Sequence, residues 1–583
     1  MFYLSQIVVE SLKGLCYANP GLTLLENDKV VYQSNVDEIA RKQVTLVAGG
    51  GAGHEPAHAA FVGPSMLTAA VTGQVFASPS AGQILTALRA VRSPHGTLVI
   101  IKNYTGDCLH FGLATERAKA EGMKVEIVIV GEDVAVGREK GGLVGRRGLA
   151  GTILVHKVAG ALAAKGATLE QVRHAAQYVA SNIATIGVGL DHCHVPGSSS
   201  FASLADGEIE LGMGIHNEPG YRKTSLPPLR TLVGSMLDTM LDTTDPDRFY
   251  LPLDFSKDRV ALLVNNLGGT PALELGVVVK EATEHLVSRR GIVVERVISG
   301  FFMTSLNMPG FSFTLLRLPS EGGLDFVPLL DEPVGAPAWR NGTTNRFTTD
   351  VVDARKGLDK ATVEEDEVGV GSLSNREAVI KAIRTAAEHV IAAEPDITSY
   401  DTLVGDGDCG HTLKQGANAV LAALPTLPFH TASQLILSLS DILDANMGGT
   451  SSALYCIFLN ALAAGLKIST AHDGVATASV WGGGLEVALR ALERYTPARP
   501  GDRTVIDALA PFVETFVATR SIAEAVHRAR EGAEATRKMK ARLGRASYVS
   551  DESVIGAAVP DAGAWGFVAL VSGLKAGLEA RRD

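Results

Sequence analysis

The sequence predicts a multidomain chain in which two α/β substrate-binding parts precede an all-α part. In the first part, short β-branched runs alternate with alanine-rich helical stretches, and after residue 374 the pattern becomes helical with almost no strand signal. The chain has 583 residues, of which 46 % are hydrophobic. At roughly 150 residues per domain, this length allows three or four domains with substantial cores.

The first α/β part is expected over residues 1–225 and the second over residues 226–340. Alternation of strands with helices is typical of βαβ units and of a mainly parallel sheet. Strands are expected at 44–47, 97–101 and 125–130 in the first part, and at 260–264, 292–298 and 315–318 in the second.

Residues 341–372 are expected to form a linker, because Gly, Thr, Asn, Asp and Glu dominate them. Residues 373–583 are expected to be all-α. Their first apolar positions (Val379, Ile383, Ala386, Ala387 and Val390) recur on one helical face. Further helices are expected at 412–423, 431–443, 451–466, 475–495, 503–518, 521–542 and 562–581.

Composition narrows the class of function. The net charge of −10 argues against nucleic-acid binding, but it leaves phosphate ligands open because Mg²⁺ can bridge carboxylates to a polyphosphate. Five scattered cysteines fit a reducing compartment. The N-terminus does not resemble a signal peptide, and the apolar run 455–466 is shorter than a bilayer span. We therefore expect a cytoplasmic protein with no membrane partner.

The first candidate site is the glycine-rich loop 49–58, GGGAGHEPAH, directly after the expected strand 44–47. Its glycines allow close approach of a ligand to the backbone, although a tight strand-to-helix turn explains them equally. His54 stands where a dinucleotide motif needs its third glycine. The string His54 to His58 also matches the zinc-protease pattern HExxH, but Pro56 suits the start of a helix and not its interior, so we disfavour zinc.

Two further loops carry polar side chains. Lys102 and Asp107 follow the expected strand 97–101, where they could hold and deprotonate a small hydroxylated substrate, or simply form a solvated turn. His216 lies in the segment 212–220, GMGIHNEPG. A buried structural histidine is the alternative there, but a neutral imidazole can also add to a carbonyl carbon.

In the all-α part, Asp401, Asp406 and Asp408 fall within eight residues of a glycine-containing loop. They suit Mg²⁺, although a surface turn is the alternative. Residues 446–452, NMGGTSS, lead into an apolar helix and suit a phosphate, while a plain N-cap by Thr450 or Ser451 is equally compatible. The segment 191–194, DHCH, is more consistent with a structural loop than with a metal site.

Seven segments together resemble the single-chain ATP-dependent dihydroxyacetone kinase family. They are GGGAGHEPAHAAFVG (49–63), VFASPSAGQI (75–84), KNYTGD (102–107), GMGIHNEPG (212–220), MTSLNMPGFSFTLL (303–316), GDGDCG (405–410) and GGTSSALY (448–455). They occur in family order over nearly the whole chain. The resemblance implies a substrate half over 1–340 and a helical-barrel nucleotide domain over 373–583. It also implies ATP and Mg²⁺ as cofactors, dihydroxyacetone as substrate and a homodimer.

Roles carry over from the family by motif. His216 resembles the residue that forms a hemiaminal with the ketone, and His54 and Asp107 resemble the acid/base pair. The positions similar to substrate contacts are Gly51, Ala52, Gly53, His54, Lys102 and Asp107, and Asp401, Asp406 and Asp408 match Mg²⁺ ligands. The nucleotide contacts would be Asp408, Cys409, Gly410, His411, Gly449, Thr450, Ser451, Arg503, Asp561, Ala562 and Gly563.

Several positions depart from the family pattern. Ala52 stands where the family usually has Ser, and Thr68 where it often has Asp. His192 and His194 replace small polar residues. These departures leave the fine substrate specificity open, although glyceraldehyde is an expected further substrate. Two alternative functions also stay open. Some relatives also cleave FAD to cyclic FMN, and the α/β half resembles non-catalytic small-ligand-binding proteins. The three aspartates and His216 favour the kinase.

Overall fold

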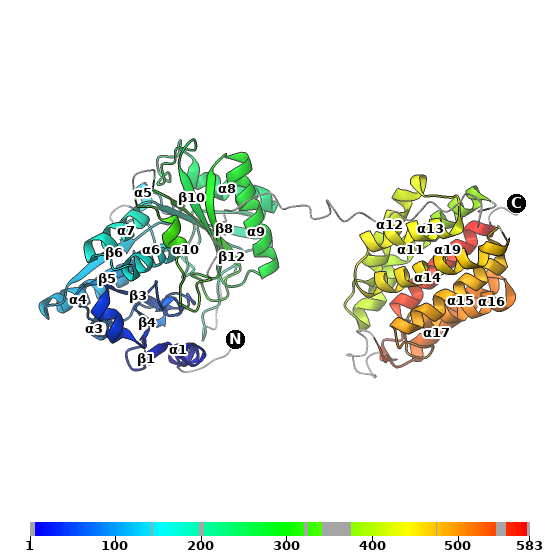
Figure 1. Ribbon diagram of the computed structural model, residues 1–583, viewed down its shortest axis with the longest axis horizontal. Coiled ribbons are helices and arrows are strands. Elements are labelled where there is room, and N and C mark those ends of the chain that lie inside the picture. The colour runs from blue at the N-terminus through cyan, green and yellow to red at the C-terminus, as the bar shows by residue number, and fades with distance from the viewer. Residues whose placement is uncertain are drawn as a thin grey trace. The chain divides into compact units, whose positions relative to one another are not determined.

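The computed structural model places the chain in two compact units, residues 1–353 and 354–583 (Figure 1). It describes residues 6–141, 144–197, 203–319, 324–340, 373, 375–473, 475–543 and 555–579. The linker predicted at 341–372 lies outside the described residues. The first unit is α/β and the second is helical, so the predicted fold class is confirmed.

The first unit begins with a six-stranded sheet of order β1-β2-β4-β3-β5-β6. Its strands are β1 (Leu22–Leu25), β2 (Val30–Gln33), β3 (Thr45–Ala52), β4 (Ala69–Val75), β5 (Thr97–Lys102) and β6 (Val125–Val130). Strands β4, β3, β5 and β6 are parallel, as the βαβ pattern predicts. The carboxyl ends of β3 and β5 therefore lie at the same edge, where ligands bind in such sheets.

Helices cover both faces of this sheet because its central strands are apolar on both sides. Val47 and Val99 pack with α3 (Ala81–Ala90) and α4 (Thr105–Ala120). Leu46 and Leu98 share the other core with α6 (Thr152–Ala164) and α7 (Leu169–Ser181). The other helices here are α1 (Ile7–Ala18), α2 (Val36–Lys42) and α5 (Arg138–Gly141), with a 3₁₀ turn at Ala59–Phe61.

The second sheet has the order β11-β10-β12-β7-β8-β9. Its strands are β7 (Ile183–Gly189), β8 (Glu208–Leu211), β9 (Arg222–Ser225), β10 (Arg259–Asn266), β11 (Val293–Gly300) and β12 (Gly310–Arg317). The expected boundary at residue 225 is therefore too late for the sheets, because β7 pairs with β12 and carries β8 and β9 with it.

One face of this sheet packs on α8 (Leu229–Leu241) and α9 (Ala272–Glu284). Ala261 and Leu263 of its other face join the core that contains α6 and α7. The unit ends with α10 (Val327–Asp331), which packs on α6. A short π-helix (His285–Arg289) extends α9.

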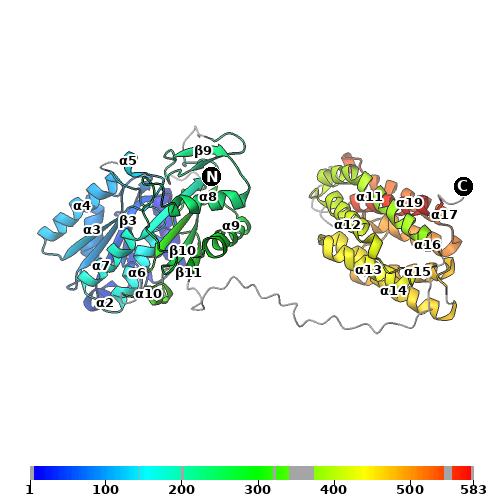
Figure 2. The same cartoon turned by 90° about the horizontal axis from the view of Figure 1, so that it is seen from above.

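In the second unit each described helix packs on the next, and the last packs on the first (Figure 2). The helices are α11 (Arg376–Val404), α12 (Cys409–Ala423), α13 (Ala432–Asn446), α14 (Gly449–Asp473), α15 (Ala478–Tyr495), α16 (Ile506–Thr519), α17 (Ile522–Ala535) and α19 (Ala562–Glu579), with 3₁₀ turns at Leu424–Thr426 and Thr536–Lys538. The ring is the helical barrel that the resemblance implies.

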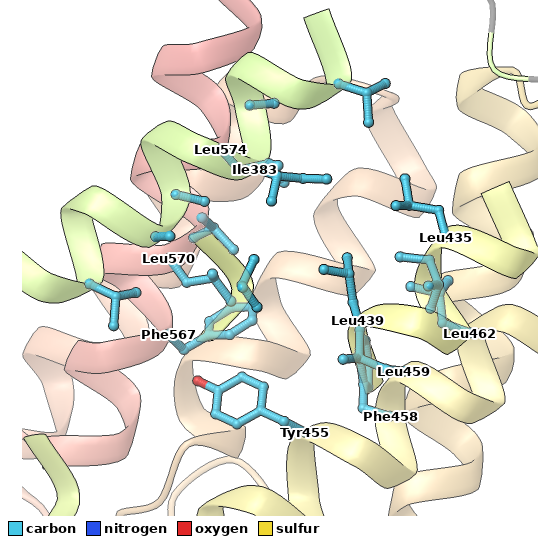
Figure 3. A pocket seen from close by; sticks show the side chains of 18 of the residues that line it. Ile383, Leu435, Leu439, Tyr455, Phe458, Leu459, Leu462, Phe567, Leu570 and Leu574 are labelled. Carbon is cyan, nitrogen blue, oxygen red and sulfur yellow. The ribbon is translucent and has the colours of Figure 1, made fainter. Parts of the chain in front are cut away.

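A cavity of about 540 Å³ lies inside this ring. Figure 3 shows apolar side chains pointing into it, among them Ile383, Leu439, Phe458 and Leu570, together with the Tyr455 ring. The stretch Gly449–Ile468 of α14 is long and apolar enough to cross a membrane, unlike the shorter run 455–466 considered from sequence. In the structure this helix packs against α13 and α15.

Candidate active site

Two histidines from distant segments meet at the edge of the first unit's parallel sheet. His54 follows β3, and His216 lies in the loop between β8 and β9. Their Nε2 atoms are 3.0 Å apart, although 162 positions separate them in the chain. His54 is 1 % exposed. The structure thus brings together two of the three residues predicted to be catalytic.

Each histidine is also held at its other ring nitrogen. Nδ1 of His54 lies 2.8 Å from the backbone carbonyl of Thr304, and Nδ1 of His216 lies 2.8 Å from Oε1 of Glu218. A carbonyl oxygen only accepts hydrogen bonds, as does an ionised carboxylate. Both Nδ1 atoms therefore carry hydrogen, and in neutral rings both Nε2 atoms would be acceptors.

Two acceptors at 3.0 Å form a hydrogen bond only when one additional proton lies between them. The pKa of His54 is well below its usual value because of its burial and the positive charges of Lys102 and His216. His54 therefore holds such a proton only weakly. The pair can release an imidazole nucleophile and pass one proton to a bound carbonyl oxygen.

Aromatic rings surround His216. Its ring meets those of His54, Phe76 and Tyr104 edge to face, with centroids 4.7 Å, 5.0 Å and 4.9 Å away. The Tyr104 hydroxyl is buried and has no hydrogen-bond partner within the described residues. Burial, followed by the charge of Glu218, raises the pKa of Tyr104 well above its usual value, so the phenol is neutral. These rings fix the plane of the His216 imidazole.

Lys102 and Asp107 lie where β5 ends and α4 begins, and both are buried. A Cβ on Gly50 would be 3.5 Å from Nζ of Lys102 and 3.5 Å from Oδ2 of Asp107, so the glycine loop of β3 runs beside both charges. Burial lowers the pKa of Lys102, and the charge of Asp107 opposes this effect. Oγ of Ser78 donates to Oδ1 of Asp107 at 2.5 Å.

The glycine-rich loop is clamped by the segment that follows β11. Leu306 donates its backbone N–H to the Gly53 carbonyl at 2.8 Å, and the Thr304 hydroxyl donates to the Glu55 carbonyl at 2.8 Å. Gly53 has φ +99°, which favours glycine, and a Cβ on Gly51 would lie 2.8 Å from the Ala77 nitrogen. Ala52 is buried. The loop therefore needs small residues to position His54.

The expected helix near Pro56 is wrong. The segment forms turns and then the short 3₁₀ helix Ala59–Phe61. Nδ1 of His58 bonds Nε2 of His156 at 3.0 Å, whereas His54 bonds His216. The two histidines thus have different partners and do not share one helical face, which supports rejection of the zinc-protease interpretation.

The three aspartates form a separate cluster in the second unit. Carboxylate oxygens of Asp401, Asp406 and Asp408 lie within 4.8 Å of one another, and they are the group suited to a metal among the described residues. Asp401 lies in the last turn of α11, and the other two precede α12. Gly407 takes φ +77° in the connecting loop. Several converging carboxylate oxygens fit the hard cation Mg²⁺.

Cys409 links this cluster to the start of α14. Its backbone N–H donates to Oδ2 of Asp401 at 3.0 Å. Burial and then the charges of Asp401 and Asp561 raise the pKa of its thiol to about 12, while a hydrogen bond with Ser451 acts in the opposite direction. Residues at the end of α11 and at the starts of α14 and α19 therefore act on one thiol.

Asp561 and Arg503 complete this region. Asp561 caps α19, accepting the N–H of Ala564 at 2.8 Å, and burial raises its pKa to about 6. Arg503 is 1 % exposed, and its charge acts on Asp561. Nε and Nη1 of Arg503 have no partner within the described residues. Such unsatisfied donors suit an anionic ligand.

The remaining predicted nucleotide residues divide into two groups. Gly449 and Thr450 are exposed in the first turn of α14, and Ala562 and Gly563 occupy the first turn of α19. The first N–H groups of a helix have no partner within the helix and suit a phosphate. Gly410 is buried against Thr398. His411 pairs with Glu394, with Nδ1 3.1 Å from Oε1.

Sequence reasoning missed Glu218, Thr304 and Tyr104 as parts of the site. Each lies inside or beside a motif that was singled out, so position in the motif was the available signal. The loop 191–194 forms no metal group within the described residues. Asn217 accepts the backbone N–H of Cys193, and Asn307 that of His194, which agrees with a structural loop.

Comparison with known proteins agrees with the division of the chain into an α/β unit and a helical unit. The Dak1 domain family matches residues 13–338, and the DAK2 domain family matches residues 403–576. A dihydroxyacetone kinase of Pichia angusta is 44 % identical over 98 % of this chain and 97 % of its own. A human triokinase/FMN cyclase is 39 % identical over 98 % and 97 %.

A solved structure is similar over the whole length. The dihydroxyacetone kinase of C. freundii in complex with AMP-PNP and Mg²⁺ has a TM-score of 0.64 and 32 % sequence identity, and the match covers 100 % of both chains.

Proposed function

Because the chain belongs to the single-chain dihydroxyacetone kinase family and is therefore a kinase of dihydroxyacetone, we propose that it holds this ketone as a hemiaminal on His216 and phosphorylates it from MgATP. The observation that carries the proposal is the contact of His54 and His216 through Nε2, with both Nδ1 atoms occupied elsewhere. This arrangement offers one nucleophilic nitrogen and one proton beside it.

The covalent step balances within this pair. The shared proton passes to His54, and Nε2 of His216 attacks the carbonyl carbon. The C=O π electrons move to oxygen, which takes the proton from His54. The product is a neutral His54, a new hydroxyl and an alkylated, positively charged His216 whose Nδ1–H faces Glu218. The net charge of the site is unchanged, so no charge is created in a buried region.

Phosphoryl transfer then needs a base for the reacting hydroxyl and cations that neutralise the charge of the phosphates. We assign the base to Asp107, which accepts the proton of the reacting hydroxyl as the oxygen attacks phosphorus. Lys102 lies beside it as a buried cation. Asp401, Asp406 and Asp408 would hold Mg²⁺, which neutralises and orients the phosphates of ATP. Arg503 and the first turns of α14 and α19 would contact the nucleotide.

Asp107 provides a test of the second step alone. We expect Asp107→Asn to lower kcat by about 10²–10⁴-fold, since the amide cannot take the proton. The hemiaminal should still form, because His54 and His216 are unchanged. ADP release measures kcat, and ¹³C NMR of dihydroxyacetone labelled at its carbonyl carbon detects the adduct. Ser78→Ala, which only removes the hydrogen bond to Asp107, serves as the milder control; equal kcat in wild type and Asp107→Asn would contradict the assignment.

The overall proposal is tested by ADP release with MgATP and three acceptors. Dihydroxyacetone and glyceraldehyde should both support release, since each has a carbonyl group, whereas glycerol has none and should support little. A chain that releases ADP equally with glycerol does not select its substrate by covalent capture. If no ADP is released with dihydroxyacetone, the kinase proposal is contradicted and a non-catalytic binding protein is the alternative.

Cleavage of FAD to cyclic FMN is the second candidate function. The name of the human relative, triokinase/FMN cyclase, favours it, and FAD carries a diphosphate that the same metal and nucleotide residues would bind. Incubation of the protein with FAD and Mn²⁺ or Mg²⁺, followed by chromatography, should show cyclic FMN. The Asp406→Asn variant should lose this activity together with the kinase activity.

We further propose that the protein is a cytoplasmic homodimer.

A further inference from the structure

We propose that Arg147 is a positioning residue, which holds the Glu218 carboxylate against His216 and so keeps Nε2 of His216 as the attacking atom. The inference rests on the proposed covalent step. Arg147 belongs to the segment between β6 and α6, far in sequence from the His216 loop, and the family motifs quoted above do not include it.

The Arg147 side chain is locked in place. Its Nε donates to Oδ2 of Asp133 at 2.8 Å, and its Nη2 lies 2.7 Å from the same oxygen. Nη2 also donates to the backbone carbonyl of Gly212 at 2.7 Å. Asp133 in turn accepts the N–H of Ala135 at 2.9 Å and is 1 % exposed. A buried carboxylate thus orients the guanidinium, which leaves Nη1 for other contacts.

Gly214 shows where Nη1 points. A Cβ on Gly214 would lie 2.4 Å from Nη1 of Arg147 and 2.0 Å from Oε2 of Glu218. Both atoms therefore lie in the space that a Cβ at position 214 would occupy, and any larger residue there would push them away. This close approach explains why a glycine precedes the nucleophile by two positions.

The Glu218 carboxylate receives its hydrogen bonds from His216. Oε2 accepts the backbone N–H of His216 at 2.8 Å, and Oε1 faces Nδ1 at 2.8 Å. Burial alone raises the pKa of Glu218, but the hydrogen bonds and charge of His216, with the charge of Arg147, bring it down to about 2. The ionised carboxylate fixes hydrogen on Nδ1 and later faces the positive charge of the hemiaminal.

The other groups that act on Glu218 do not replace Arg147. Tyr104 is a neutral phenol, and Asp133 is a carboxylate already bound by Arg147. Lys102 is also a cation whose charge acts on Glu218. The charge of Asp107, however, acts on Lys102 more strongly than the charge of Glu218 does. Arg147 is the cation whose guanidinium lies beside the Glu218 carboxylate at Gly214 and whose charge lowers the pKa of Glu218.

The test measures the fraction of adduct against pH, with ¹³C-carbonyl dihydroxyacetone and no nucleotide. An opposite charge nearby lowers the pKa of a carboxyl by about 1–3 units, so Arg147→Gln should move the acid limb of adduct formation upward by about one pH unit or more. The sign follows because Glu218 must be ionised, and loss of the cation raises its pKa. Arg147→Lys should restore part of the shift.

Arg146→Gln is the matched control. Arg146 is the neighbouring residue, yet it stacks on Tyr250 and bonds the Glu132 and Ile183 carbonyls. It should leave the pH profile unchanged. Gly214→Ala is the second variant, needed if Arg147→Gln does not fold. It separates Arg147 from Glu218 without removing either charge, and it should shift the profile in the same direction.

The outcomes separate this inference from the proposed function. No adduct in the wild-type protein overturns the covalent step and this inference with it. A wild-type adduct with unchanged profiles in folded Arg147→Gln or Gly214→Ala overturns the role of Arg147 alone. An equal shift in Arg146→Gln, or no recovery in Arg147→Lys, would show a structural effect of the loop and would also overturn it.

Discussion

Replacement of His216 by alanine is expected to abolish the ketone adduct and to lower kcat/KM for dihydroxyacetone by about 10³-fold or more. Covalent attachment converts the encounter of ketone and MgATP into a reaction of a held substrate, and such orientation contributes several kcal/mol to rate enhancement. The residual activity should lose its preference for ketone over glycerol, because the carbonyl no longer reacts. ADP release with both acceptors measures the ratio.

The control for this variant is His194→Ala. His194 lies in the neighbouring loop and bonds Asn307, and we give it no role in the reaction. It should retain the adduct and the substrate preference. An adduct that survives in His216→Ala, located by peptide mass spectrometry on another residue, would contradict the assignment of the nucleophile.

The second large effect is expected from Asp406→Asn combined with Asp408→Asn. Removal of two of the three clustered carboxylates should weaken Mg²⁺ binding and lower the kinase rate by about 10³-fold or more, because phosphoryl transfer depends on charge neutralisation. Adduct formation in the absence of nucleotide should be unchanged, since the α/β unit supplies those residues. ADP release and ¹³C NMR measure the two steps separately.

Asp444→Asn provides the matched control, because Asp444 is an exposed carboxylate of the same helical unit outside the cluster. It should leave ADP release unchanged. Normal kinase activity in the double variant, with Mg²⁺ near its usual concentration, would show that the metal binds elsewhere.

The sequence predicted six of the twelve described strands and the helical character of the second unit, because their periodicity is local. The expected strand 125–130 coincides with β6, and the helical period after residue 374 leads into α11. The boundary at 225 failed for the opposite reason. Pairing of β7 with β12 joins residues more than 120 positions apart, and no local pattern reports such a partner. The short hairpin of β8 and β9 follows β7 into the second sheet.

The candidate site shows the same difference between local and long-range information. His54, His216 and the three aspartates lie in motifs whose residue types already indicate chemistry. Thr304 was missed because it acts through its backbone carbonyl, which any residue has, across 250 positions of sequence. Arg147 was missed because its proposed role depends on its position beside Glu218, which the absence of a side chain at Gly214 permits. Only three-dimensional packing reveals this position. Pro56 predicted a helix start, whereas the chain turns there.

A crystal structure of the protein with dihydroxyacetone tests the central claim most directly. We expect continuous density from Nε2 of His216 to the carbonyl carbon, a tetrahedral geometry at that carbon, and its new hydroxyl beside His54. A planar ketone that stays separate from His216, in a protein that still releases ADP on addition of MgATP, would contradict covalent capture.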